Sequence, residues 1–188
     1  MRAFIAIEIS EEQKAALGRI EERLRYAGAD VKWVRPEIAH LTLKFLGEID
    51  EKRAADVASK LDAAVASSGA FDLMLKDIGA FPSVDRARVI WVGLGMGAAK
   101  AAGLAARIDS ALMDIGFARE ERPFSQHLTI GRVRSGLNRE ALAEKIRSSS
   151  AEIPSASPHK VTAVILFRST LTPQGPVYAR IHESRLSG

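Results

Sequence analysis

One strand-like tetrapeptide occurs twice in this chain, and the distance between its copies limits the folds that the chain can adopt. His40-Leu41-Thr42-Leu43 recurs as His127-Leu128-Thr129-Ile130, 87 positions later in a chain of 188 residues. Each copy follows a proline within a few residues and shows the polar–apolar alternation of a half-buried strand. A chain that repeats one strand at nearly half its length is expected to form two similar lobes that face each other. The rest of the sequence gives the repeat little support, so we expect the duplication to be partial at best.

Composition excludes several classes of protein. The chain contains no cysteine, which excludes a disulfide framework, a thiol nucleophile and cysteine-based metal sites. No apolar run approaches the roughly 20 residues that span a bilayer. The N-terminal stretch Met1–Glu8 reaches a carboxylate too early for a signal peptide and is typical of a strand. We therefore expect a cytoplasmic protein with no membrane partner.

The charge of the chain favours contact with a small number of phosphates. Lys and Arg total 27 and Asp and Glu total 23, which gives a net charge of +4. Of the basic residues 18 are Arg and 9 are Lys, and Arg is the residue that can bind phosphate through two parallel hydrogen bonds. High genomic GC content produces the same excess of Arg. A net charge this small does not suit binding along a long nucleic acid, but it suffices for one or two terminal phosphates.

Strands and helices are interspersed along the sequence, with hairpins as well as crossovers, which predicts an α+β fold. Ser10 and Gln13 form a capping-box pattern in which each side chain bonds the backbone of the other, and Asn138 is expected to cap a later helix. We expect helices that start near residues 10, 50, 97 and 138 and end near 26, 67, 115 and 148. Strands are expected over residues 3–9, 31–34, 39–46, 71–81, 88–94, 126–133, 161–167 and 177–182.

The repeated tetrapeptides are the candidate site. Successive side chains of a strand point to opposite faces, so His40 and Thr42 share one face, and His127 and Thr129 share the corresponding face of the second copy. The same alternation places Lys44 on the histidine face, where we interpret it as a solvated charge, and places Phe45 on the opposite, core-facing side. If the two lobes face one another, the site is a cleft that holds two imidazoles and two hydroxyl groups.

These residue types suit the displacement of a group on phosphorus. The unperturbed pKa of histidine, about 6.5, allows one imidazole to be neutral and another protonated near neutral pH. Placed on opposite sides of one phosphorus atom, they can act as base and acid, while threonine hydroxyls stabilise the charge on the phosphate oxygens. The alternative interpretation as two metal ligands is weakened because neither tetrapeptide contains an Asp or Glu.

Around these tetrapeptides the chain resembles the RNA 2′,3′-cyclic phosphodiesterases, which belong to the two-histidine phosphoesterases and are also called 2′-5′ RNA ligases. The resemblance covers the whole chain. Departures are minor: Gln126 stands where many members have proline, and Phe167-Arg168 replaces the more usual Tyr-Glu. The matching segments are Arg2 to Ile7, Trp33 to Pro36, His40 to Glu48, Pro123 to Arg132 and Leu166 to Tyr178.

The resemblance implies a bilobal fold of two antiparallel sheets with flanking helices and pseudo-two-fold symmetry, which we expect to form one domain over residues 1–188. It implies hydrolysis of a 2′,3′-cyclic phosphate at an RNA end or on a small nucleotide, without a metal or other cofactor. We expect a monomer, although the sequence does not reveal the oligomeric state. His40 is expected to be the proton donor and His127 the proton acceptor. Thr42, Thr129 and Arg132 are expected to bind the substrate phosphate. Ligation that forms a 2′-5′ linkage would use the same acid and base, so it stays open. A non-catalytic module that binds phosphorylated RNA ends is a further alternative.

Arg132 lies five residues after His127, and strict alternation would therefore direct it away from the histidine face. Gly131, directly before it, is a plausible site for a β-bulge, which would return Arg132 to that face. The sequence alone leaves both placements open.

Overall fold

The computed structural model describes residues 1–121, 123–150, 152–154 and 156–188. The chain forms two four-stranded sheets in which all neighbouring strands are antiparallel. The first sheet has the order β10-β9-β1-β3 and the second has the order β2-β7-β6-β5. The strands of the first are β1 (Arg2–Glu8), β3 (His40–Glu48), β9 (Ala163–Thr172) and β10 (Gly175–Arg185). Those of the second are β2 (Val31–Trp33), β5 (Leu75–Phe81), β6 (Val89–Leu94) and β7 (His127–Val133).

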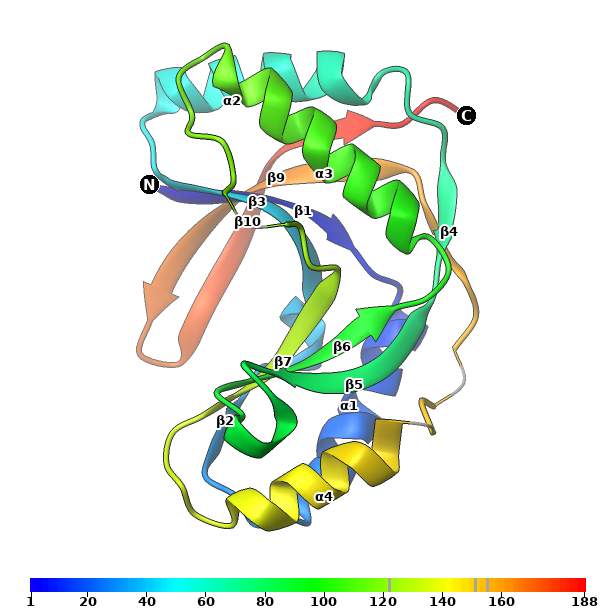
Figure 1. The fold of residues 1–188 in the computed structure, drawn as a ribbon. Helices are drawn as coiled ribbons and strands as arrows, with labels where there is room; N and C mark the ends of the chain where they lie inside the picture. Colours follow the sequence, from blue (N-terminus) through cyan, green and yellow to red (C-terminus); the bar gives the residue numbers. More distant parts are fainter. Residues whose placement is uncertain (122, 151, 155) are drawn as a thin grey trace.

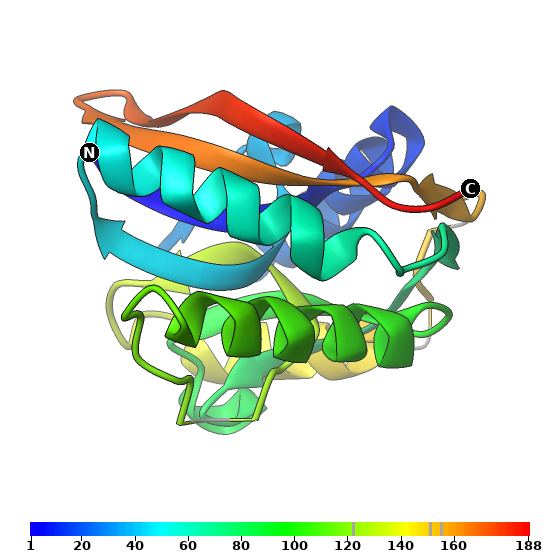
Figure 2. The same ribbon diagram turned by 90° about the horizontal axis from the view of Figure 1, so that it is seen from above.

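Two helices pack with each sheet, at opposite ends of the molecule (Figure 1). Helices α2 and α3 lie side by side, as the view from above also shows (Figure 2), and contact β10 and β3 of the first sheet. Helices α1 and α4 contact each other, and α4 packs on β5 of the second sheet. The helices are α1 (Glu11–Arg25), α2 (Glu51–Val65), α3 (Ala98–Met113) and α4 (Arg139–Ser150), and the short 3₁₀ turns are Pro36–Ile38 and Val84–Arg86. The predicted α+β, bilobal, antiparallel architecture is confirmed.

Local signals place the helix starts, with two differences from expectation. The Ser10 hydroxyl accepts a hydrogen bond from the Gln13 amide, but the Gln13 side chain does not return it. Instead, it donates to the carbonyl of Leu73 in the core. Asn138 adopts a positive φ of 50°, and its side-chain amide donates to the carbonyl of Gly28. In both cases a tertiary partner replaces the expected local one.

The strand predicted over residues 71–81 is divided between two sheets. Its first part, β4 (Phe71–Leu73), pairs with β8 (His159–Val161) in a separate two-stranded sheet. Its second part is β5, which pairs with β6. The break lies at Met74, whose amide donates to the carbonyl of Met96.

The repeat extends over most of the fold and is therefore more complete than the sequence suggests. Shifted by 87 residues, five elements of the first half start within one residue of an element of the second half. The pairs are α1 with α3, β3 with β7, α2 with α4, β4 with β8 and β5 with β9. The two halves of the chain do not, however, form one lobe each. The first sheet and its helices combine β1, β3 and α2 with α3, β9 and β10, whereas the second combines α1, β2, β5 and β6 with β7 and α4. The described residues contain no helix that is long and apolar enough to cross a membrane.

Both histidine strands contain a bulge at the same place. In β3, Thr42 pairs with Ala6 and Lys44 pairs with Ile5, so Leu43 is the extra residue. In β7, Thr129 pairs with Trp91 and Gly131 pairs with Ile90, so Ile130 is the extra residue. Leu43 and Ile130 occupy equivalent positions of the two tetrapeptides. Because a bulge reverses the alternation of faces beyond it, it decides which later side chains accompany each histidine.

Candidate active site

His40 is held at the start of β3 by its own backbone and by aromatic rings. Its Nδ1 lies 2.9 Å from the carbonyl oxygen of Ile38. A carbonyl can only accept, so Nδ1 carries a proton and donates it, and Nε2 is the nitrogen left for chemistry. The ring of Phe4 stacks on the imidazole at 4.7 Å between centroids, and Tyr178 meets it edge-on at 5.1 Å.

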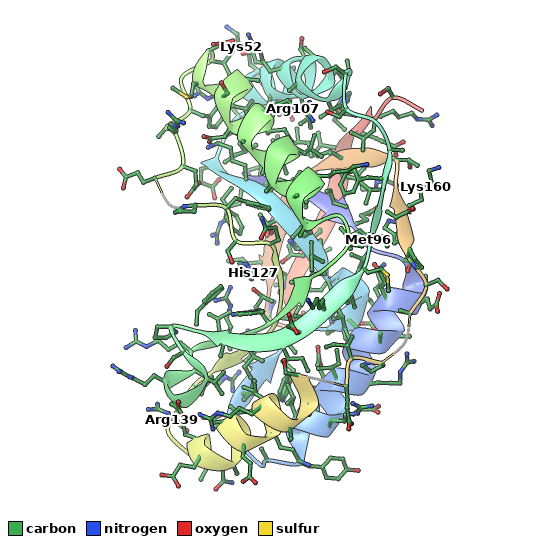
Figure 3. All side chains as sticks on the ribbon, turned by 45° about the vertical axis from the view of Figure 1, so that its right-hand side comes forward. Lys52, Met96, Arg107, His127, Arg139 and Lys160 are labelled. Atoms are coloured by element: carbon green, nitrogen blue, oxygen red, sulfur yellow. The ribbon has the colours of Figure 1, made fainter. Side chains whose placement is uncertain are left out.

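His127 repeats this arrangement on β7. Its Nδ1 lies 2.8 Å from the carbonyl oxygen of Ser125, again two residues before the histidine. Phe81 meets its imidazole edge-on at 5.0 Å. His127 lies in the middle of the molecule (Figure 3), where β3 and β7 are in contact. Both histidines thus direct the same nitrogen at an equivalent carbonyl.

Both imidazoles have a pKa below the ordinary value of histidine. Burial is the main cause at His40, and its hydrogen bond to Ile38 partly opposes the effect. Burial is also the main cause at His127, where the bond to Ser125 opposes it and the positive charge of Arg132 adds to it. Without a ligand, therefore, the environment of each histidine favours the neutral form.

The two threonines accompany the histidines as predicted. His40 and Thr42 pair with Glu8 and Ala6 of β1, and these alternate residues share a face. Thr129 likewise lies on the His127 face. Both threonines are half-buried, and neither hydroxyl has a hydrogen-bond partner within the described part of the chain. Each can therefore donate a hydrogen bond to a ligand.

The bulge in β7 returns Arg132 to the face of His127. Val89, Trp91 and Gly93 alternate along β6, and they pair with Arg132, Thr129 and His127 respectively. Directly opposed residues of an antiparallel pair point to the same side. Arg132 thus shares the face of the second tetrapeptide, as the bulge hypothesis predicted, although the extra residue is Ile130 and not Gly131.

The bulge in β3 corrects two expectations. Lys44 is not a solvated charge on the histidine face: it is 5% exposed and forms an ion pair with Asp109 of α3. Phe45, expected in the core, is 73% exposed and pairs with Phe4 on the face of His40. Alternation failed because Leu43 is an extra residue. The 87-residue spacing offered a signal, since it relates Phe45 to Arg132.

Electrostatic contacts connect the two histidine faces. The positive charge of Arg132 acts on His127 of its own strand and also on Tyr178 of the first sheet, whose ring touches His40. Arg2 of β1 acts on Tyr178 as well. A tyrosine that contacts one histidine is therefore within range of the arginine that accompanies the other.

Three aromatic residues could stack on a base, namely Trp33, Trp91 and Tyr178, and two of them lie on the histidine faces. Tyr178 contacts His40. Trp91 shares the face of Thr129 and lies over Gly79, where an added Cβ would come within 2.3 Å of the indole. Trp33 is directed elsewhere, since it pairs with Gly131 and its ring lies under the guanidinium of Arg25 of α1.

Two cavities lie beside β3, away from the two histidine side chains. One, of about 330 Å³, lies against α3 and includes Leu43 and Asp109, and the other, of about 500 Å³, includes Phe45. Neither is lined by a histidine, and the matched geometry of the imidazoles, not cavity size, marks the candidate site. Within the described residues, no group of three or more His, Asp or Glu side chains is arranged to hold a metal ion.

Known proteins share both the sequence pattern and the fold. The family model described as LigT-like phosphoesterase matches residues 7–91 and 94–178, two segments offset by the same 87 residues. The chain is 34% identical to the RNA 2′,3′-cyclic phosphodiesterase of Methanothermobacter thermautotrophicus over 187 residues, which is 99% of each chain. It is 35% identical to the protein of the same name from Thermotoga maritima, over 100% of this chain and 97% of the relative.

Solved structures agree with the architecture. TT0787 of Thermus thermophilus superposes with a TM-score of 0.80 at 26% identity, over 100% of this chain and 99% of that chain. E. coli LigT in its apo form has the same fold, with a TM-score of 0.75 at 23% identity over 100% and 98% of the two chains. The protein therefore belongs to the LigT-like phosphoesterase family and is a phosphoesterase.

Proposed function

We propose that the protein hydrolyses 2′,3′-cyclic phosphate ends of RNA to 2′-phosphomonoesters by general acid–base catalysis, with His40 as acid and His127 as base. The observation that carries this proposal is the matched state of the two imidazoles. Each comes from an equivalent bulged strand and uses Nδ1 on the carbonyl two residues earlier, so each keeps Nε2 for proton transfer. Two relatives that match this chain over nearly its full length carry the name of this activity.

The proposed reaction is an in-line displacement by water. The water oxygen bonds to phosphorus as Nε2 of His127 takes its proton, and the bond from phosphorus to the 3′ oxygen breaks as Nε2 of His40 protonates that oxygen. The products are a 2′-phosphomonoester and a 3′ hydroxyl. The hydroxyls of Thr42 and Thr129 and the guanidinium of Arg132 stabilise the charge on the non-bridging oxygens.

The electrostatics support this division of roles. Arg132 disfavours a second positive charge at His127, which suits a base that must begin neutral. Burial lowers the pKa of His40 in the free protein, and a bound phosphate anion is expected to raise the pKa of this imidazole and favour its charged form. Substrate binding thus helps to supply the acid.

Phe45 is suited to the terminal base. It is the most exposed aromatic side chain on the face of His40, and base–aromatic stacking contributes roughly 1 to 3 kcal/mol per base. Tyr178 lies against His40 and is less exposed. We therefore assign base stacking to Phe45 in preference to Tyr178.

The test is turnover of a short RNA that ends in a 2′,3′-cyclic phosphate, with identification of the phosphate position in the product. His40→Ala and His127→Ala should each lower kcat by at least about 10²-fold, the lower range for one acid or base. His182→Ala is the matched control, because His182 pairs with Asp62 on the α2 side of the first sheet and its loss should leave turnover unchanged.

Two results would contradict metal-independent catalysis by the two histidines. One is retention of activity in either His40→Ala or His127→Ala. The other is activity that disappears with EDTA and returns with a divalent ion, which would favour the interpretation of the histidines as metal ligands. A 3′-phosphate product would instead contradict the assignment of the leaving oxygen.

A further inference from the structure

A second cation stands beside Arg132 on the histidine face of the second sheet. Lys32 of the edge strand β2 is the direct partner of Arg132 across β2 and β7. Since Arg132 also pairs with Val89, the three residues form one row on the same side of the sheet. Lys32 and Arg132 are both exposed.

The two positive charges have no acidic partner. Neither Lys32 nor Arg132 has a carboxylate within 4 Å among the residues that the structure describes. Like charges directly opposite each other in a sheet are destabilising. Some other surface cations, such as Lys60 and Arg147, are paired with carboxylates. An uncompensated pair of this kind is suited to an anionic ligand.

The positions of the two cations suggest different ligand groups. Arg132 acts on His127 and Tyr178, so its charge serves the site of the scissile phosphate. Lys32 lies on β2, one strand further toward the edge of the sheet than Arg132 on β7, and neighbouring strands are about 4.8 Å apart. A ligand that fills both positions must carry a second negative charge beyond the cyclic phosphate, and the phosphodiester backbone of an RNA strand provides it.

We propose that Lys32 binds the phosphodiester that precedes the terminal nucleotide, and that the enzyme therefore prefers oligonucleotide ends to cyclic mononucleotides. The proposal rests on the proposed function, since it assumes that the cyclic phosphate lies between the two histidines. It assigns Lys32 a role in substrate selection and no part in the proton transfers. The exposed edge position of β2 leaves room for the chain to leave the site in this direction.

A competing path would follow the first sheet. Arg2 of β1 shares the face of Phe4 and, through its partner Ser169, that of Tyr178. It also has no carboxylate within 4 Å among the described residues. We favour Lys32 because its partner across the neighbouring strand is another cation on the same face. The strand partners of Arg2 are Ser169 and Glu48, and neither is a cation.

The experiment compares kcat/KM for a nucleoside 2′,3′-cyclic phosphate and for a dinucleotide that ends in the same cyclic phosphate. Lys32→Gln should lower kcat/KM about tenfold for the dinucleotide, the effect of one charge-assisted hydrogen bond, and leave the mononucleotide unchanged. The plot of log(kcat/KM) against log salt concentration has a negative slope. In the variant this slope should become shallower by about 0.7 for the dinucleotide alone, as expected for the loss of one phosphate contact to a single strand.

Lys52→Gln is the matched control, because Lys52 is an exposed lysine of α2 at the outer edge of the molecule, away from His127 (Figure 3). This variant removes the same net charge and should leave kcat/KM unchanged for both substrates. Arg2→Gln tests the competing path in the same assay.

The outcomes separate this inference from the function on which it rests. Equal kcat/KM for the two substrates in the unmodified enzyme, an equal loss on both substrates in Lys32→Gln, or a dinucleotide-specific loss in Arg2→Gln alone would overturn the role of Lys32 while the proposed activity stands. Failure of the unmodified enzyme to hydrolyse either substrate would overturn the proposed function, and this inference with it.

Discussion

At the scale of single residues, the charge of Arg132 has two effects that an experiment can separate. In the proposed mechanism it attracts the substrate phosphate, and it also lowers the pKa of His127. The first effect acts on binding, and the second acts on the pH at which the base becomes available. A variant that removes the charge should therefore change both the affinity for substrate and the pH profile, and the two changes can be measured separately.

Arg132→Gln should move the acidic limb of the pH profile of kcat/KM upward. In the proposed mechanism His127 must be neutral to act as base, so the rate should fall as pH drops through its pKa. Loss of the neighbouring positive charge raises this pKa, and the limb should shift to higher pH, while the rate at all pH values falls through loss of phosphate binding. An acidic limb that stays in place or shifts downward would show that Arg132 does not act on the base.

A buried carboxyl makes stability depend on pH. Glu21 of α1 is 4% exposed, and burial raises its pKa to about 7, an effect that Arg25 opposes and Glu37 increases. The unfolded chain releases this proton near pH 4.5, so between pH 4.5 and 7 the unfolded state holds fewer protons than the folded state. The free energy of unfolding should therefore decrease across this window and level off above it.

Glu21→Gln should remove this dependence. At pH 8 the variant should be more stable than the unmodified protein by up to about 3 kcal/mol, since a pKa difference of one unit corresponds to about 1.4 kcal/mol. At pH 4.5 the two should differ little. Urea unfolding at both pH values provides the measurement, and a variant that is less stable at pH 8 would contradict the assignment.

At the scale of elements, the bulge in β3 determines the packing of α3 as well as the face of Phe45. It turns Lys44 inward, where the ammonium bonds Asp109 of α3 and the carbonyl of Ala118, at 3.0 Å. Asp109 also accepts from the amide of Glu120, at 3.2 Å. The ion pair thus joins the strand of His40 to the segment that leads from α3 toward His127.

Lys44→Met should cost roughly 3 kcal/mol in the free energy of unfolding, because it leaves a mostly buried carboxylate without its cation. The double variant Lys44→Met/Asp109→Leu should regain most of this loss. Lys60→Met, which breaks an exposed pair with Asp114, should cost less than about 1 kcal/mol. Urea unfolding tests all three, and similar losses in the two single variants would contradict a buried role for Lys44.

Sequence reasoning at this scale succeeded where a signal is local and failed where a partner strand intervenes. Asp50 accepts from the amide of Arg53, as its position before a helix indicated. The faces of the histidines and threonines followed from alternation. Lys44 and Phe45 were assigned to the wrong faces because a bulge is a property of two paired strands, and the pairing of β3 with β1 cannot be read from β3 alone.

At the scale of the whole molecule, each sheet is assembled from both halves of the chain. In the second sheet, β7 of the second half lies between β2 and β6 of the first half. In the first sheet, β9 and β10 of the second half continue the β1–β3 pair. We propose on this basis that residues 1–188 fold as one cooperative domain.

Fragments cut within Gly95–Gly97, between β6 and α3, should therefore not fold alone. Fragment 1–95 lacks the strand that joins β2 to β6, and fragment 96–188 lacks the strands beside β7 and β9. Each should give a largely unfolded circular dichroism spectrum, and mixing the two should restore structure. Independent cooperative unfolding of either fragment would show that the half, and not the pair, is the folding unit.

The sequence by itself determined the candidate histidines and threonines, the α+β class and the existence of a repeat, because each of these depends on local alternation or on spacing along the chain. Only the tertiary structure decided that the repeat runs through most elements, that Phe45 and Arg132 stand in equivalent places, and that Lys32 lies beside Arg132. These facts depend on strand pairing between residues far apart in the chain. A one-residue slip in such pairing exchanges the two faces of a strand, and no signal within the strand itself records it.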